Sequence, residues 1–268
     1  MDSHALEYYS SYSDESPHGH FHRVIMLQEE KGLSWDEVSK MAPKITKGWY
    51  ELSRVSVKDR IDFTQDYWLA KIPYHPNLEK SLDRFFSSLD DIGIFLTQQS
   101  QDDPFEPQMI YSFSDNGGFF HGNAPVTENE IIALQKDFPD YILPLDYTAF
   151  LQIHNGFAKL TDTGMMKAAE LKQSYYNFQE MIEQQEPIVT SQGVSVNPHS
   201  LIPFYKSFGM PFFQCFWAEW YPENEMGNVY YSGLTKTISD CSKPDCDVET
   251  MAFKTFTDWL LFYLEKIE

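Results

Sequence analysis

The sequence is poor in cysteine, in basic residues and in long apolar runs, and each shortage excludes a class of protein. Three cysteines in 268 residues are too few for a disulfide framework, which favours a reducing compartment. Lys and Arg number 20 against 40 Asp and Glu, a net charge of −20. Such a charge repels phosphate, so neither nucleic acid nor an anionic membrane is an expected partner. Because there is also no membrane-length apolar run and no secretory signal pattern, we expect a cytoplasmic protein.

Recognisable catalytic and cofactor motifs are also missing. The sequence has no Gly-x-Ser-x-Gly elbow, phosphate-binding loop, dinucleotide fingerprint or His-Glu-x-x-His helix. Cys241 and Cys246 have no His or further Cys nearby to complete a zinc site. His18, His20 and His22 alternate as metal ligands can, but their polar segment offers no fixed geometry and no supporting groups. We therefore predict no enzyme, no bound metal and no cofactor.

The order of patterns predicts a tail and two structured regions. Residues 1–20, rich in Ser, Asp, His and Tyr, are expected to be a flexible tail. Residues 21–121 are expected to form helices and one β-hairpin. The expected helices are 24–30, one opened by the Ser34–Glu37 capping box, 57–71 and 77–91, and the expected strands are 94–98 and 108–114. A boundary is placed near residue 122, after a Gly-rich turn.

The second region, residues 122–268, contains the most informative segment of the chain. Leu143–Gly156 (LPLDYTAFLQIHNG) reads as a short helix in which Asp146 accepts hydrogen bonds from the first turn and Asn155–Gly156 ends it. Tyr147, Phe150, Leu151 and His154 would share one face. His154 and Asn155 point in different directions on such a helix, which argues against a catalytic dyad.

Helices and aromatic strands fill the rest of this region. A capping box at Thr127 and Glu130 opens one helix, and residues 168–185 and 253–266 predict two more. Strands are expected at 201–206, 212–220 and 228–232, and both faces of FFQCFWAEW are apolar enough for a central, buried strand. An exposed aromatic platform is the alternative for that strand. The pattern predicts an α+β fold with an antiparallel sheet covered by helices.

Several of these features occur in the order found in the SUKH superfamily. They are the 127–138 helix, the Leu143–Gly156 segment, Ile202–Pro203–Phe204, the aromatic strand ending at Trp220, and a closing helix with Phe256 and Trp259. Residues 122–268 thus resemble a superfamily that spans fungal cell-wall-synthesis regulators and bacterial toxin-immunity proteins. The segment after Phe204 lacks the Gly-Gly or Gly-Asp pair that members often carry. The resemblance implies a non-enzymatic α+β binding module, and residues 1–121 would extend its sheet or form a separate cap.

Two functions stay open, with an enzyme of unrecognised class as a third that has less support. The first is a protein-binding module of immunity or regulatory type that engages a basic protein, such as a toxin. The second is a scaffold or regulator in a cell-wall or host-interaction pathway. The negative charge would steer a basic partner towards the protein. The alternative explanation is that the charge only keeps the protein soluble. The expected partner-binding residues are Glu219, Tyr221, Glu223, Glu225, Asp102 and Asp103.

Overall fold

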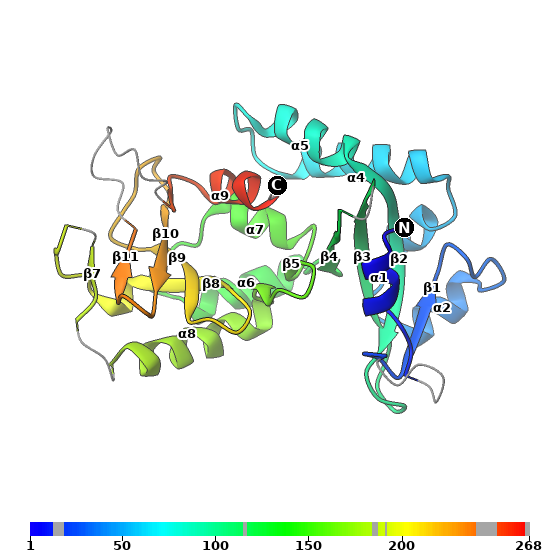
Figure 1. The fold of residues 1–268 in the computed structure, drawn as a ribbon, viewed down its shortest axis with the longest axis horizontal. Coiled ribbons are helices and arrows are strands. Elements are labelled where there is room, and N and C mark those ends of the chain that lie inside the picture. Colours follow the sequence, from blue (N-terminus) through cyan, green and yellow to red (C-terminus); the bar gives the residue numbers. More distant parts are fainter. Residues whose placement is uncertain (13–18, 115–116, 184–186, 191, 240–250, 266–268) are drawn as a thin grey trace. The chain divides into compact units, whose positions relative to one another are not determined.

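A computed structural model describes residues 1–12, 19–114, 117–183, 187–190, 192–239 and 251–265. Contacts divide the chain into two units, whose elements are labelled in Figure 1. Unit 1 comprises Met1–Lys71, Glu79–Pro125 and Ile153–Thr161, and unit 2 comprises Ile72–Leu78, Val126–Gln152 and Asp162–Glu268. The units interleave along the sequence, so neither corresponds to one continuous range. The domain boundary expected near residue 122 stays a prediction. His18, Cys241 and Cys246 lie outside the described residues.

Unit 1 is built on a five-stranded antiparallel sheet in the order β1-β2-β3-β4-β5. Its strands are β1 (Arg23–Met26), β2 (Leu89–Gln98), β3 (Glu106–Phe113), β4 (Phe119–Asn123) and β5 (Phe157–Lys159). The hairpin expected from the sequence is the β2–β3 pair. It belongs to this sheet and not to the sheet of unit 2, and β5 is contributed by residues far downstream.

Strand β1 corrects the helix expected at residues 24–30. Ile25 is buried and pairs with Leu96 at the edge of the sheet. Seven residues are too few to stabilise a helix by themselves, whereas alternate residues of a short apolar run can pack on an existing sheet. Tertiary pairing therefore decides the conformation of this segment.

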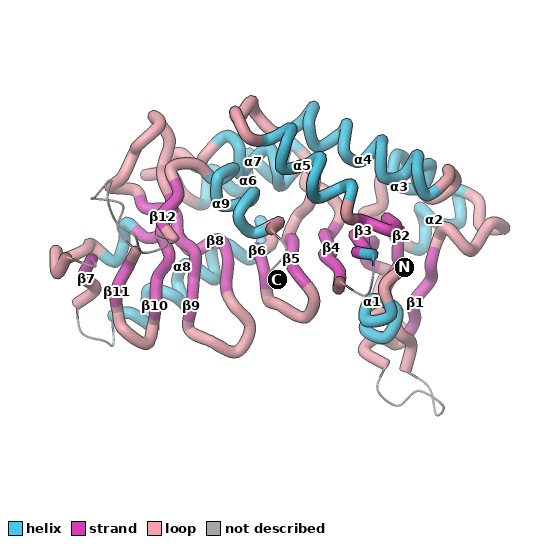
Figure 2. Tube along the Cα trace, turned by 45° about the horizontal axis from the view of Figure 1, so that its top comes forward, coloured by secondary structure: helices cyan, strands magenta, loops and turns pink. Residues whose placement is uncertain are grey.

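Four helices of unit 1 are α2 (Trp35–Met41), α3 (Lys47–Leu52), α4 (Val57–Lys71) and α5 (Leu78–Ser87). Helix α4 has the predicted bounds, and the Ser34–Glu37 capping box is present. Figure 2 shows α4 and α5 lying along one face of the sheet. On that face Trp68 of α4 packs edge-on against Phe86 and Tyr111, and all three are almost fully buried. These rings form part of the core of unit 1.

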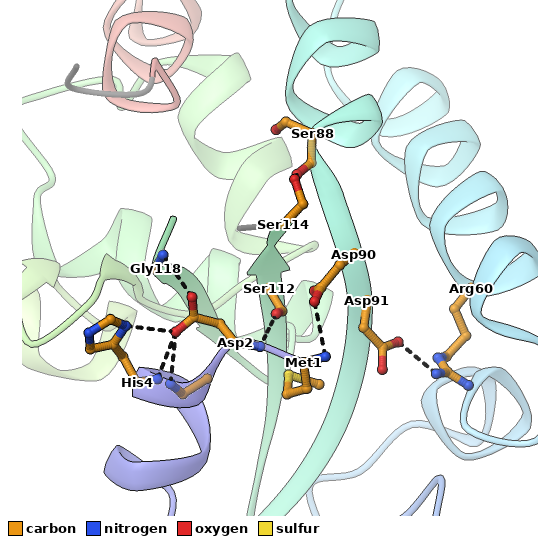
Figure 3. Close-up of polar contacts among 11 residues, drawn as sticks. Met1, Asp2, His4, Arg60, Ser88, Asp90, Asp91, Ser112, Ser114 and Gly118 are labelled. Atoms are coloured by element: carbon orange, nitrogen blue, oxygen red, sulfur yellow. Dashed lines mark hydrogen bonds and ion pairs between the residues drawn. The ribbon is translucent and has the colours of Figure 1, made fainter. Parts of the chain in front are cut away.

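The opposite face of the sheet is covered by the N-terminal segment, which corrects the flexible tail expected at residues 1–20 as far as residues 1–12 are concerned. Residues 13–18 lie outside the described residues. Helix α1 (Ser3–Tyr8) places Ala5 and Tyr9 in a buried cluster with Phe95, Ile110 and Phe119. The Asp2 carboxylate is almost completely buried and accepts hydrogen bonds from the amides of His4 (2.7 Å) and Gly118 (3.0 Å), as Figure 3 shows. Burial of the Asp2 carboxyl opposes ionisation, but these bonds outweigh it and lower its pKa. Apolar burial and helix capping together order a polar-looking segment.

Unit 2 contains a second, larger sheet in the order β6-β8-β9-β10-β11-β7, with β12 paired to β10. Its strands are β6 (Gly164–Met165), β7 (Val189–Thr190), β8 (Leu201–Lys206), β9 (Phe212–Trp217), β10 (Asn228–Ser232), β11 (Thr237–Ile238) and β12 (Ala252–Phe253). All pairs are antiparallel except β11–β7. The aromatic strand β9 lies in the interior of the sheet with its four central residues buried, which confirms the buried interpretation.

Helices cover both faces of this sheet, as predicted for an α+β fold. They are α6 (Glu128–Asp137), α7 (Leu145–Leu151), α8 (Ala168–Glu183) and α9 (Phe256–Tyr263). On one face, Phe178 of α8 packs edge-on against Phe213 and Tyr231. On the other, Phe256 of α9 contacts Tyr147 of α7 and Phe204 of β8. Figure 1 shows α8 on one side of the strands and α7 with α9 on the other.

The end of α7 differs from the sequence prediction. The helix stops at Leu151, so His154, Asn155 and Gly156 do not continue its face. Gly156 adopts a positive φ of 93°, and its carbonyl accepts a hydrogen bond from the amide of Asn123 at 3.1 Å. Glycine tolerates this left-handed conformation, which turns the chain into β5. The Asn-Gly pair therefore starts a strand of unit 1 instead of capping the helix.

Candidate partner-binding site

The loop between β9 and β10 carries four of the residues predicted to bind a partner. Its base is closed by a hydrogen bond from the Trp217 amide to the Gly227 carbonyl at 2.9 Å. A side chain at Gly227 would meet the Trp220 ring at 2.3 Å, so glycine allows that indole to pack against the loop. Asn224 at the turn has φ 65°, which asparagine tolerates better than most residues. The loop is thus held in a defined conformation.

The same loop forms one wall of a cavity of about 330 Å³ in unit 2. Glu223, Asn224 and Glu225 line it from the loop, and Asp146 lines it from the first turn of α7. Residues 73–75 and the start of α9, through Thr255 and Thr257, also line the cavity. Tyr74 at this cavity is 91% exposed, the largest exposure among the large hydrophobic side chains of the described residues. The cavity therefore combines carboxylates with an exposed aromatic ring.

Asp146 links the two helices at this cavity. The sequence predicts that it serves its own helix, and its Oδ1 does accept from the Tyr147 amide at 2.9 Å. Its Oδ2 instead accepts from the amide and hydroxyl of Thr257, at 2.7 and 2.9 Å, and so binds the first turn of α9. Burial raises the pKa of Asp146 despite these bonds. A buried carboxylate at two helix N-termini also interacts favourably with both helix dipoles.

Glu225 is a structural residue as well as an acidic one. Its Oε2 accepts a hydrogen bond from the Leu145 amide at 3.0 Å, at the start of α7. Partial burial, followed by the neighbouring charge of Asp146, raises the pKa of Glu225, although the bond from Leu145 opposes this. The contribution from Asp146 to this shift shows that the two carboxylates repel each other when both are ionised.

The other predicted partner-binding residues are all solvent-accessible. Glu219 and Glu223 are exposed, and Tyr221 is 49% exposed, as expected for an accessible aromatic residue. Glu223 forms an exposed ion pair with Lys254 at 3.6 Å, a contact of little energetic weight. Asp102 and Asp103 are exposed in the β2–β3 turn of unit 1, so they belong to a different unit from the loop residues. Their role in binding stays a prediction.

Sequence reasoning missed the 73–75 segment. His75 lies 2.9 Å, through Nε2, from the carboxylate of Asp258, which also caps α9 through Thr255. Pro73 and Pro76 flank the segment, and prolines on either side of an aromatic residue are a signal of an extended surface turn. That signal marks exposure, but nothing in the local sequence places Tyr74 beside a loop that follows it by about 150 residues.

His154 is the most strongly perturbed histidine and lies in the core of unit 1. Its Nδ1 is 3.2 Å from the Asn123 carbonyl, which can only accept, so Nδ1 carries the proton and donates. Nε2 then accepts from the Tyr111 hydroxyl at 2.6 Å, and that hydroxyl accepts from Trp68 Nε1 at 3.1 Å. Burial lowers the pKa of His154 from 6.5 to about 3. This is a neutral structural histidine. Across the described residues, no cluster of three or more His, Cys, Asp or Glu is arranged to hold a metal.

Acidification should destabilise the protein through His154. Between its folded pKa of about 3 and its unfolded value of 6.5, the unfolded chain binds more protons than the folded chain. The contribution of this residue to stability is therefore complete above pH 6.5 and is lost as the pH falls, by about 1.4 kcal/mol per pH unit. Urea denaturation between pH 7 and 5 should show a steeper loss for the natural protein than for His154→Gln. Equal pH dependence in the two proteins would contradict this assignment.

A family comparison now identifies the domain. A family model described as SMI1 / KNR4 family (SUKH-1) matches residues 125–261, just over half of the chain. The chain belongs to the SMI1 / KNR4 family (SUKH-1). The resemblance predicted from the sequence is thereby confirmed. No sequence among curated proteins matches the chain closely enough to count as a relative.

The SUKH-1 match spans α6, α7 and α8, the strands β5–β12 and most of α9. Membership supports a regulatory or immunity-type domain in general, of a kind that is generally non-catalytic and interacts with proteins. Within the described part of the chain, no helix is both long and apolar enough to cross a bilayer.

Proposed function

We propose that this SUKH-1 protein is a cytoplasmic, non-enzymatic binding module of immunity or regulatory type. In this proposal the cavity beside the β9–β10 loop receives Lys or Arg side chains of a basic protein partner, such as a toxin. The observation that carries the proposal is the cavity lined by Asp146, Glu223 and Glu225, with the exposed ring of Tyr74 at its edge. Carboxylates attract a cationic side chain, and an aromatic face adds a cation–π contact.

Charge and exposure support the same proposal. The net charge of −20 would accelerate encounters with a basic protein at low salt. Tyr221 and Tyr74 are exposed aromatic residues at or beside the acidic loop, and Tyr is common among the residues that dominate interface energies. Asp102 and Asp103 of unit 1 are proposed as further acidic residues that attract the basic partner.

Reversing two loop charges should slow association with the partner. We expect Glu219→Lys combined with Glu223→Lys to reduce the association rate at least tenfold at low salt, because charged loops steer encounter over about 10 Å. The difference should shrink as salt is added. Stopped-flow or surface-binding kinetics would measure it, once a pull-down with mass spectrometry has supplied the partner. Glu225 is left unchanged because it bonds the first amide of α7.

The matched control is Glu180→Lys combined with Glu183→Lys. Both residues are exposed near the end of α8, on the opposite face of the sheet from α7 and α9, and the net charge changes equally. Lysine near a helix C-terminus also favours the helix. If the control slows association as much as the loop variant does, the loop is not the binding site. An association rate indifferent to both variants and to salt would contradict the electrostatic proposal.

A further inference from the structure

Unit 1 contains a second cavity that the proposed function does not use. It has a volume of about 350 Å³ and lies among α3, α4, β3 and residues 153–154. Every residue that lines it belongs to unit 1. Sites for small molecules in proteins typically measure 300–1,000 Å³, so the cavity is at the lower end of that range.

The walls of this cavity are aromatic and uncharged. Trp49, Trp68 and Tyr111 are buried in its wall, and none of its described lining residues is Asp, Glu, Lys or Arg. Its one titratable imidazole, His154, is kept neutral by burial, which lowers its pKa to about 3. In a chain of net charge −20, this neutral lining selects against an ionic occupant.

The rim of the cavity exposes aromatic side chains to water. Phe63 is 57% exposed and Tyr67 is 44% exposed, and both lie on α4 and line the cavity. The rest of that helix face is buried through Trp68 and Thr64. An apolar occupant that removes these exposed rings from water lowers the free energy of the complex.

The hydroxyl of Thr46 in the lining has a proton to donate. Thr46 Oγ1 caps α3 by accepting from the Trp49 amide at 3.2 Å, and within the described residues its O–H has no acceptor. By contrast, the Thr64 hydroxyl donates to the Arg60 carbonyl at 2.7 Å, and the Tyr111 hydroxyl is engaged between Trp68 and His154. The cavity thus offers a hydrogen-bond donor to its occupant.

We propose that this cavity binds a small, neutral, predominantly aromatic molecule that carries a hydrogen-bond acceptor. The aromatic walls supply stacking and edge-on contacts, Thr46 supplies the donor, and the uncharged lining rejects anions and cations. The proposal is independent of the acidic cavity in unit 2, because no residue is shared between the two.

A fluorescent ketone tests the proposal directly on the full-length protein. The probe is 6-propionyl-2-dimethylaminonaphthalene, which is neutral, aromatic and carries one carbonyl acceptor, and whose emission shifts to shorter wavelength in an apolar site. We expect saturable one-to-one binding with a blue shift. The anionic probe 8-anilinonaphthalene-1-sulfonate should bind at least tenfold more weakly, because no lining cation compensates its sulfonate.

A blocking variant and a matched control locate the site. Gly48 lines the cavity from α3, and a Cβ there would meet only Thr46 Oγ1, at 4.0 Å, so a side chain can start at this position and Gly48→Leu is expected to occupy part of the cavity. Gly32 is exposed with open space around it, which makes Gly32→Leu the control. We expect Gly48→Leu to weaken binding of the ketone at least tenfold and Gly32→Leu to leave it unchanged, with circular dichroism confirming that both variants fold.

Three results would overturn the proposal. They are the absence of saturable ketone binding, undiminished binding by a folded Gly48→Leu protein, and sulfonate binding as tight as ketone binding. None of these outcomes depends on the partner of unit 2, so the two proposals can fail separately.

Discussion

Replacement of Phe150 by alanine should lower the free energy of unfolding by about 3–5 kcal/mol, the usual cost of removing a fully buried aromatic side chain. Phe150 has no solvent exposure, and its ring lies 5.7 Å from that of Phe256. Tyr147, Leu151 and Leu260 are equally buried around the contact between α7 and α9. The apolar face of each of the two helices expected from the sequence, one within residues 143–156 and one within 253–266, predicts that these five residues are buried together. The structure confirms that burial. Truncation would leave a cavity that the two helices, tied by Asp146 and Thr257, cannot close by moving.

Phe208→Ala is the control for this prediction. Phe208 belongs to the same unit but is 70% exposed, so its loss should change the free energy of unfolding by less than about 0.5 kcal/mol. Urea denaturation followed by circular dichroism measures both variants. Similar midpoints for Phe150→Ala and the natural protein would show that the α7–α9 contact does not stabilise the fold.

Asp91→Ala should have a comparable effect in unit 1, about 3–5 kcal/mol, because it leaves a buried guanidinium without its counter-charge. Arg60 of α4 is 5% exposed, and its Nη2 lies 2.6 Å from Asp91 Oδ1, a contact drawn in Figure 3. A further bond from Nη1 to the Val55 carbonyl, at 2.9 Å, fixes the guanidinium but does not neutralise it. The pair joins α4 to strand β2.

Two further variants separate the buried charge from a general loss of contact. Asp62→Ala removes the exposed ion pair with Lys58 on the same helix and should cost no more than about 0.5 kcal/mol. Arg60→Met combined with Asp91→Leu removes both charges and should recover most of the stability lost by Asp91→Ala. If Asp91→Ala proves no worse than Asp62→Ala in denaturant, the buried ion pair is not a stabilising contact.

The contact between Asp91 and Arg60 also marks a limit of what local sequence patterns indicate. The adjacent acids Asp90 and Asp91 look like the solvated pairs Asp102–Asp103 and Glu29–Glu30, which are indeed exposed. In the structure, Asp91 meets Arg60 and Asp90 meets the amino group of Met1 at 3.0 Å. Neither partner is encoded locally, because both are brought to β2 by chain segments at least 31 residues away. Charge pairing over such separations depends on the fold.

Local rules worked where a single element contains its own signal. The capping boxes at Ser34 and Thr127, the bounds of α4, and the strands β8 and β10 follow from side chains a few residues apart. The candidate site was predictable only in part. The acidic residues Glu223 and Glu225 could be predicted from the charge and the turn pattern of their segment. The position of Tyr74 at the same cavity could not, because it depends on how distant parts of the chain fold together.

By itself, the sequence predicted an acidic α+β protein with a domain of the SUKH superfamily, because charge, capping and the buried aromatic pattern are properties of neighbouring residues. Only the tertiary structure decided that residues 23–26 form a strand, that the N-terminal segment covers a sheet, and that β5 completes the sheet of unit 1. It also decided that Asp146 ties α9 to α7 and that His154 is neutral. Each of these outcomes depends on burial and on partners distant in the chain, and the free energy of such contacts exists only once the chain has folded.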